Sequence, residues 1–216
     1  MTGPHPLAAI LRRAALGSPP APDATVEILP GPPGLVDAVC AFTAHTVVAA
    51  ALPALEIRSR LDAHDLAAPM SATFLAWLAE RLGTRPGAVD IVMAAPRPTT
   101  TGLALEARGD LAGHPRVRRA TRYRRDVRVF APTDGSAVVT IGRGLADRWE
   151  MAFEVEPAHR GRGLGRMVAA AASRLVPDDE ALFAQCSPGN VASLRALLAA
   201  GYRPIAAECL FLRRGD

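Results

Sequence analysis

The stretch that most constrains this fold is Glu156–Arg166, with the sequence E-P-A-H-R-G-R-G-L-G-R. Gly161, Gly163 and Gly165 follow an alternating strand pattern and precede an amphipathic helix pattern. Because glycines lack Cβ atoms, several backbone N–H groups can approach one anion closely, and the helix N-terminus favours negative charge. The pattern therefore predicts a strand–turn–helix unit that forms a binding site for phosphate or pyrophosphate.

The sequence on both sides of this turn predicts a mixed β-sheet flanked by helices, an α/β fold. Thr133–Gly135 is a hairpin signal. In Trp149–Val155 the apolar residues alternate with Glu150, Ala152 and Glu154, which are expected on the opposite face. The expected elements are a helix over 115–123, strands over 126–131, 137–141 and 149–155, a helix over 163–176, a strand over 181–186, a helix over 190–200 and a strand over 205–212.

Composition removes several classes of protein. All 25 basic residues are Arg, so the chain has no Lys for a Walker-type phosphate loop, a Schiff base or a pyridoxal-phosphate anchor. The three cysteines are widely spaced, which disfavours disulfides and a zinc site and favours a reducing, cytoplasmic location. No metal is expected. The longest apolar region, Val36–Leu55, is interrupted by Asp37, His45 and Pro53, so no membrane span or targeting segment is expected.

The glycine turn has a resemblance to a known family. The run Arg160–Gly165 fits the R/Q-x-x-G-x-G/A signature of the GNAT superfamily of N-acetyltransferases. Ser187–Asn190, followed by Ser193 and by Ala200–Tyr202, resembles that family's second signature. A dinucleotide-binding reading fits less well, because the glycines run G-x-G-x-G and lie late in the chain. The resemblance covers roughly residues 126–212.

The resemblance implies a GNAT-type sheet that binds acetyl-CoA as a co-substrate. The strand before the turn would splay from its neighbour and offer backbone groups to the pantetheine arm, and the turn would hold the pyrophosphate. Two alternatives stay open: the turn is only a tight connection, or Asn190 is only a helix N-cap. The cofactor-binding residues implied are Phe153, Val155, Arg160, Gly161, Arg162, Gly163, Leu164, Gly165, Arg166, Asn190 and Ser193.

The resemblance also implies direct transfer of an acetyl group from the thioester to an amine, aided by a general base. Glu150 and Glu154 are the candidate catalytic residues; the alternative is that both are ordinary solvent-side strand residues. Leu197 stands where the family often has a Tyr as general acid. Tyr202, Tyr123, Ser193 or water could replace it. The departure leaves a second hypothesis open, a non-catalytic acyl-CoA-binding or regulatory module.

The acceptor implied is the amine of a small molecule or a peptide. The basic stretch Arg116–Arg128 raises nucleic acid as a partner, but no nucleic-acid motif accompanies it. A solvated helix face, or a patch near the 3′-phosphate of coenzyme A, is the favoured interpretation. No membrane partner is expected, and the protein is expected to be a monomer or homodimer.

Residues 1–113 predict a separate α/β lobe, with the acetyltransferase domain over 114–216. The lobe is either a degenerate GNAT-like half or an extension that covers the substrate. A Pro-rich linker is expected over 17–23, and an interruption of regular secondary structure is expected over 96–101. The expected elements are a short helix over 5–16, strands over 25–29, 46–50 and 89–94, and helices over 35–42 and 71–82.

Overall fold

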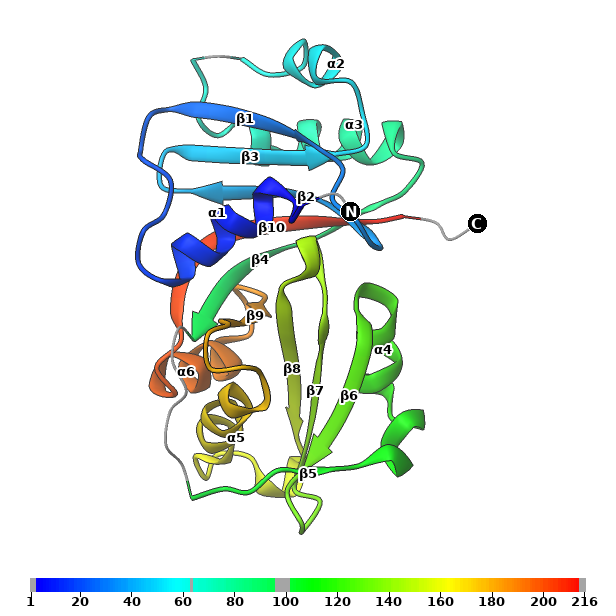
Figure 1. Cartoon of the computed structure of the whole chain (residues 1–216), viewed down its shortest axis with the longest axis vertical. Coiled ribbons are helices and arrows are strands. Elements are labelled where there is room, and N and C mark those ends of the chain that lie inside the picture. Colours follow the sequence, from blue (N-terminus) through cyan, green and yellow to red (C-terminus); the bar gives the residue numbers. More distant parts are fainter. Residues whose placement is uncertain (1–2, 63, 96–101, 214–216) are drawn as a thin grey trace. The chain divides into compact units, whose positions relative to one another are not determined.

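A computed structural model of the chain describes residues 3–62, 64–95 and 102–213 (Figure 1). Contacts divide it into two units. Unit 1 comprises Met1–Ile91, Leu145–Asp147 and Ile205–Asp216, and unit 2 comprises Val92–Gly144 and Arg148–Pro204. The last strand is thus grouped mainly with the first half of the chain. The single division expected after residue 113 stays a prediction.

Unit 1 is a sheet with helices. Its strands neighbour one another in the order β1-β3-β2-β10-β4. β1 and β3 are parallel, whereas β2 is antiparallel to both β3 and β10. The elements are α1 (Pro6–Ala15), β1 (Thr25–Pro30), β2 (Val36–Phe42), β3 (His45–Ala50), α2 (Ala54–Arg58), a 3-10 turn (Ala68–Met70), α3 (Ala72–Arg81), β4 (Pro86–Ala95), a 3-10 turn (Leu145–Asp147) and β10 (Arg203–Leu212).

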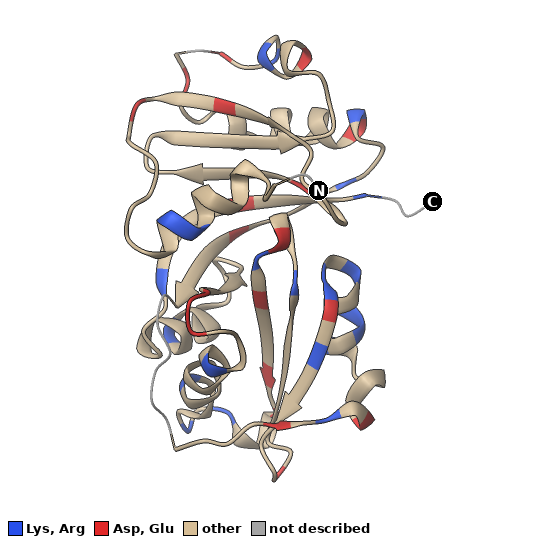
Figure 2. Ribbon diagram, viewed as in Figure 1, with Lys and Arg blue, Asp and Glu red and all other residues tan. Residues whose placement is uncertain are grey.

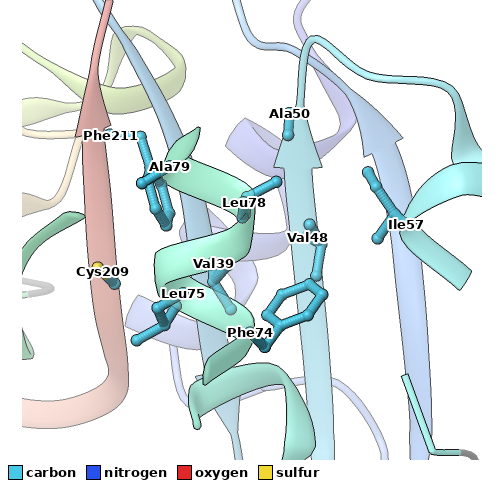
Figure 3. Packing of buried hydrophobic residues seen from close by; sticks show 10 residues of the cluster. All are labelled: Val39, Val48, Ala50, Ile57, Phe74, Leu75, Leu78, Ala79, Cys209 and Phe211. Atoms are coloured by element: carbon cyan, nitrogen blue, oxygen red, sulfur yellow. The ribbon is translucent and has the colours of Figure 1, made fainter. Parts of the chain in front are cut away.

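The core of unit 1 forms where α3 packs on the sheet (Figure 3). Ser71 caps α3, since its side-chain oxygen accepts a hydrogen bond from the Phe74 N–H at 3.2 Å. The helix expected over 71–82 is confirmed as α3, and its Phe74, Leu75 and Leu78 are all buried. They pack with strand and helix residues that include Val39, Val48, Ala50, Ile57, Ala79, Cys209 and Phe211.

The helix expected over 35–42 is wrong, because this segment is strand β2. β2 lies between β3 and β10 and is buried at six of its seven residues, so it shows no alternation that would mark it as a strand. Asp37 is 1% exposed. Its carboxylate is held by Arg213 at 2.6 Å and by the Ala51 N–H at 3.1 Å.

Unit 2 confirms the expected mixed sheet flanked by helices. Its strands run in the order β9-β8-β7-β6-β5, with β8 and β9 parallel and the other pairs antiparallel. The elements are β5 (Glu106–Ala107), a 3-10 turn (Gly109–Gly113), α4 (Pro115–Tyr123), β6 (Arg125–Ala131), β7 (Ala137–Arg143), β8 (Trp149–Val155), a 3-10 turn (Pro157–His159), α5 (Leu164–Ala172), a 3-10 turn (Ser173–Leu175), β9 (Leu182–Cys186) and α6 (Val191–Ala199).

The hairpin between β6 and β7 forms as the turn signal predicts. Gly135 has φ of +70°, a conformation that favours glycine. The Asp134 carboxylate accepts a hydrogen bond from the Ser136 N–H at 3.0 Å. β6 therefore pairs antiparallel with β7, from Arg125↔Arg143 to Phe130↔Val139. On its other edge β7 pairs with β8, from Ala137↔Val155 to Arg143↔Trp149. The break expected over 96–101 lies outside the described residues. Within the described ranges, no helix is long and apolar enough to cross a membrane.

Candidate active site

Strands β8 and β9 separate within unit 2. Their parallel pairing covers Trp149↔Leu182, Glu150↔Phe183 and Met151↔Ala184 and then stops. β8 nevertheless continues to Val155 and β9 to Cys186. The two strands thus form a fork, which is closed at Met151 and open towards Val155. Along the open part, the β8 backbone has no ladder pairing to β9 and can hydrogen-bond an extended ligand.

The glycine turn follows the open end of the fork. Gly161 and Gly163 have φ of +77° and +80°, in the left-handed region where any other residue costs about 1–2 kcal/mol. Gly163 is the N-cap of α5 and supplies no side chain to its first turn. A Cβ on either glycine would meet no described atom within 4 Å. The space before the helix N-terminus is therefore open, as an anion-binding site requires.

Gly165 differs from the other two glycines because its lack of a side chain allows α5 to pack closely against its neighbours. A Cβ there would lie 3.4 Å from the Ala196 Cβ, 3.5 Å from the Phe153 ring and 3.8 Å from a Val155 methyl group. α5 thus lies tightly against both β8 and α6, and the side chains of Phe153 and Val155 face it. In Figure 1, α5 and α6 lie beside one another on this side of the unit 2 strands. This packing holds the N-terminus of α5 near the open fork.

The arginines of the turn add positive charge around the predicted phosphate-binding site. Arg162 and Arg166 are exposed. The Arg160 Nε donates a hydrogen bond to the Val155 carbonyl oxygen at 2.9 Å, which ties the turn to the end of β8. That oxygen keeps a second lone pair, so the contact implied for Val155 is still possible.

Asn190 caps helix α6. Its side-chain oxygen accepts a hydrogen bond from the Ser193 N–H at 3.2 Å. The capping alternative is therefore observed, while contacts of Asn190 and Ser193 with a cofactor stay a prediction. Leu197, at the position of the family's Tyr, is 2% exposed and packs in the core.

Tyr202 is buried and already bonded. Its hydroxyl donates to the Ala169 carbonyl oxygen at 3.2 Å. Burial raises its pKa well above the ordinary value. A hydroxyl placed in this way stabilises the fold and is poorly suited to donate a proton to a leaving group.

Glu150 is not on a solvent-facing surface, contrary to the alternative from the sequence. It is 1% exposed, and its two carboxylate oxygens accept hydrogen bonds from Arg124 Nε at 2.9 Å and Arg148 Nε at 2.8 Å. A Cβ on Gly144 would collide with the carboxylate. Burial raises the pKa of Glu150, but the charges of Arg148 and Arg124 outweigh it and lower the pKa to about 2.

Arg124 and Arg148 were not marked as site residues by the sequence. They are 9% and 3% exposed. Arginines lie on many elements of the described chain, as the blue segments of Figure 2 show, so charge alone does not single out these two. A guanidinium that folds inwards to meet a buried carboxylate has the same sequence signature as one that stays in water. Knowing that Glu150 is buried would have been needed to predict that Arg124 and Arg148 are its partners.

Glu154 lies on the same face of β8 but in a different environment. It is 36% exposed, and its carboxylate is 3.2 Å from Arg116 Nη2 of helix α4, which is itself 31% exposed. This pair is screened by water and can open at low cost. The two candidate carboxylates therefore differ sharply: Glu150 is a buried, fixed anion, and Glu154 is accessible.

Together these features define an α/β domain with an unpaired stretch of strand β8 beside an open helix N-terminus. Residues 96–202 match the model of the acetyltransferase (GNAT) family. The chain therefore carries a domain of the GNAT superfamily over these residues. The search of curated proteins found no match.

Solved structures with detectable similarity are also described as GNAT proteins. One is a GNAT-family acetyltransferase from Colwellia psychrerythraea, at 12% identity and TM-score 0.41, covering 66% of this chain and 63% of that one. A second, described as a putative GNAT-family acetyltransferase from Novosphingobium aromaticivorans, has 18% identity and TM-score 0.43, with coverages of 62% and 69%. A GCN5-related N-acetyltransferase from Kribbella flavida has 16% identity and TM-score 0.39, with coverages of 65% and 64%. This chain thus spans less than two thirds of the first and third of these structures.

Within the part of the chain that the structure describes, no group of three or more His, Cys, Asp or Glu side chains could hold a metal ion.

Proposed function

We propose that the fork and the glycine turn bind acetyl-CoA, and that the domain transfers its acetyl group to an amine. The observation that carries this proposal is the loss of β8–β9 pairing beyond Met151↔Ala184, immediately before the glycine turn. The pantetheine arm would lie along Ala152–Val155 like an added strand. Its pyrophosphate would lie at the N-terminus of α5, near Arg162 and Arg166.

The transfer follows from this placement. The amine nitrogen attacks the thioester carbonyl carbon, a C–N bond forms, and the C–S bond breaks as the coenzyme A thiolate leaves. An alkylammonium with a pKa near ~10.4 must first lose a proton, because it has no lone pair for attack. A base that can accept this proton, directly or through water, is therefore needed.

Of the two candidate bases, we assign proton acceptance to Glu154. It is accessible, and its contact with Arg116 can open to water. Glu150, whose pKa is lowered to about 2 by two guanidinium groups, is a weak base at neutral pH. Its proposed role is to fix Arg124 and Arg148 in place.

The thiolate is proposed to take its proton from water. Leu197 offers no hydroxyl, and the Tyr202 hydroxyl is buried and donates to Ala169. A thiol has an ordinary pKa of about 8.5, so its protonation near neutral pH needs no strong acid.

The test is release of coenzyme A thiol from acetyl-CoA, measured with and without a panel of amines. The proposal expects amine-dependent release that falls about 10²- to 10⁴-fold in Glu154→Gln, the range typical of a general base. Tight binding of acetyl-CoA with no amine-dependent release would instead favour the second candidate, a non-catalytic acyl-CoA-binding module, which the packed Leu197 keeps open. Whether the acceptor is a small molecule or a peptide, whether the protein is a monomer or homodimer, and its cytoplasmic location stay predictions.

A further inference from the structure

Arg124 spans the closed end of the fork. Its Nη2 donates to the carbonyl oxygen of Met151, the last paired residue of β8, at 3.3 Å. The same atom donates to the side-chain oxygen of Gln185, the first residue of β9 beyond the pairing, at 3.1 Å. Its Nε is bonded to Glu150. The guanidinium is thus fixed at the point where the strands separate.

One part of this guanidinium has no partner. Arg124 is 91% buried, since 9% of its side chain is exposed, yet its Nη1 makes no hydrogen bond to any described residue. The Gln185 amide lies beside it, where its hydrogen bond to Glu150 helps to lower the pKa of that carboxyl group. A buried donor without a partner costs about 1–3 kcal/mol, and more when it is charged. Such groups persist where a ligand completes them.

The direction of the fork indicates which ligand group would arrive there. In the proposed complex, the cofactor enters from the open end, where its pyrophosphate meets α5. Its thioester would then lie towards Met151 and the closed end. The unpartnered Nη1 belongs to a guanidinium that is fixed at this closed end, where the acetyl group would meet its acceptor.

We propose that the acceptor amine carries a carboxylate close to its nitrogen, as in an amino acid, and that Arg124 binds this carboxylate with help from Gln185. This inference rests on the proposed function. The unpartnered Nη1 is a donor only, so the ligand group must be an acceptor. A carboxylate offers two oxygens with several lone pairs, and its hydrogen bonds to guanidinium are about twice as strong as those of a neutral carbonyl.

The arrangement would also help the reaction. A carboxylate held by Arg124 fixes the orientation of the adjacent amine. The positive charge of the guanidinium nearby disfavours the ammonium form of that amine and so lowers its pKa. Arg124 is a binding residue in this scheme, and Glu154 remains the proton acceptor.

The experiment compares matched acceptors on the full chain. The twenty common amino acids are screened with acetyl-CoA, and the best is compared with its amide and with its decarboxylated amine, for example leucine, leucinamide and isoamylamine. The expected kcat/KM for the acid exceeds that of the amine by about 10- to 100-fold, the strength of one charged hydrogen bond. The amide should fall between them. Equal rates for all three would overturn the inference and leave the proposed function intact.

Variants connect the selectivity to the named residues. Arg124→Gln should reduce the acid-to-amine ratio to within about threefold of one, and Gln185→Leu should reduce it by about 3- to 10-fold. Because the ratio comes from one preparation, a variant that folds only in part still reports it. Arg122→Gln, an exposed α4 arginine, is the charge-matched control and should keep the wild-type ratio. An unchanged ratio in Arg124→Gln would overturn the inference.

Binding gives a second readout that does not need turnover. With coenzyme A present, the acid should raise the melting temperature of the wild type but not of Arg124→Gln, and the decarboxylated amine should raise neither. Coenzyme A binding without stabilisation by any amino acid would overturn the inference alone. Failure to bind acetyl-CoA at all would overturn the proposed function as well.

Discussion

Replacing Glu150 with Gln separates a structural anion from a catalytic base. The substitution keeps the shape of the side chain but removes its charge. In the wild type that charge is buried, at 1% exposure, between Arg124 at 2.9 Å and Arg148 at 2.8 Å. Glu150→Gln leaves both guanidinium groups without the carboxylate that they share.

The expected loss of stability is large. Removing one partner of a buried ion pair costs about 3–5 kcal/mol. The pKa of Glu150, lowered from 4.5 to about 2, gives a similar figure of about 3 kcal/mol at neutral pH. For a chain of this size, the melting temperature of Glu150→Gln should fall by roughly 6–20 °C.

The pH dependence has a definite sign. Because the folded-state pKa is below the unfolded one, the stabilisation by Glu150 is present above about pH 4.5 and is lost as pH falls towards 2. The difference in unfolding free energy between wild type and Glu150→Gln should therefore shrink by about 2 kcal/mol between pH 5 and pH 3.

The assay is urea unfolding of both proteins at several pH values, with Glu154→Gln as the matched control. The Glu154–Arg116 pair is about one-third exposed on both sides, so that control should lose at most about 1 kcal/mol. If Glu150→Gln were as stable as the wild type but inactive, Glu150 would be the base and its assignment as a fixed anion would be refuted.

Two further substitutions test assignments around the site. Asn190→Ala should destabilise the protein by about 1 kcal/mol in urea unfolding, because it removes the cap on the Ser193 N–H; a larger loss of acetyl-CoA affinity than of stability would show that Asn190 also binds the cofactor. Tyr202→Phe should cost about 1 kcal/mol through the lost hydrogen bond to Ala169 while keeping the transfer rate; a rate loss beyond tenfold would restore Tyr202 as the acid.

The local elements of unit 2 were predictable because their signals are local. The alternation over Trp149–Val155 predicts a strand with the bounds that the structure shows, and the glycine turn predicts a helix start within one residue of Leu164, where α5 begins. Helix α4, over Pro115–Tyr123, also has the predicted bounds. The Gly163 conformation, with φ of +80°, follows from its place between strand and helix.

The features that depend on distant partners were not predictable. β2 was expected to be a helix, because a strand buried on both faces is an apolar run without alternation. The buried Asp37 depends on Arg213, 176 residues away. Glu150 alternates with apolar neighbours as an outward residue would. It is nonetheless buried, because Arg124 and Arg148 fold over it.

The most direct test of the account is calorimetric titration of the purified protein with acetyl-CoA, with NAD and dephospho-CoA as controls. Acetyl-CoA should bind to the wild type with micromolar affinity, NAD should not bind, and Gly163→Val should lose binding of acetyl-CoA. A side chain at this left-handed position strains the turn by about 1–2 kcal/mol and projects into the open space before α5. Normal acetyl-CoA binding by a folded Gly163→Val protein, or no binding by the wild type, would contradict the placement of the site.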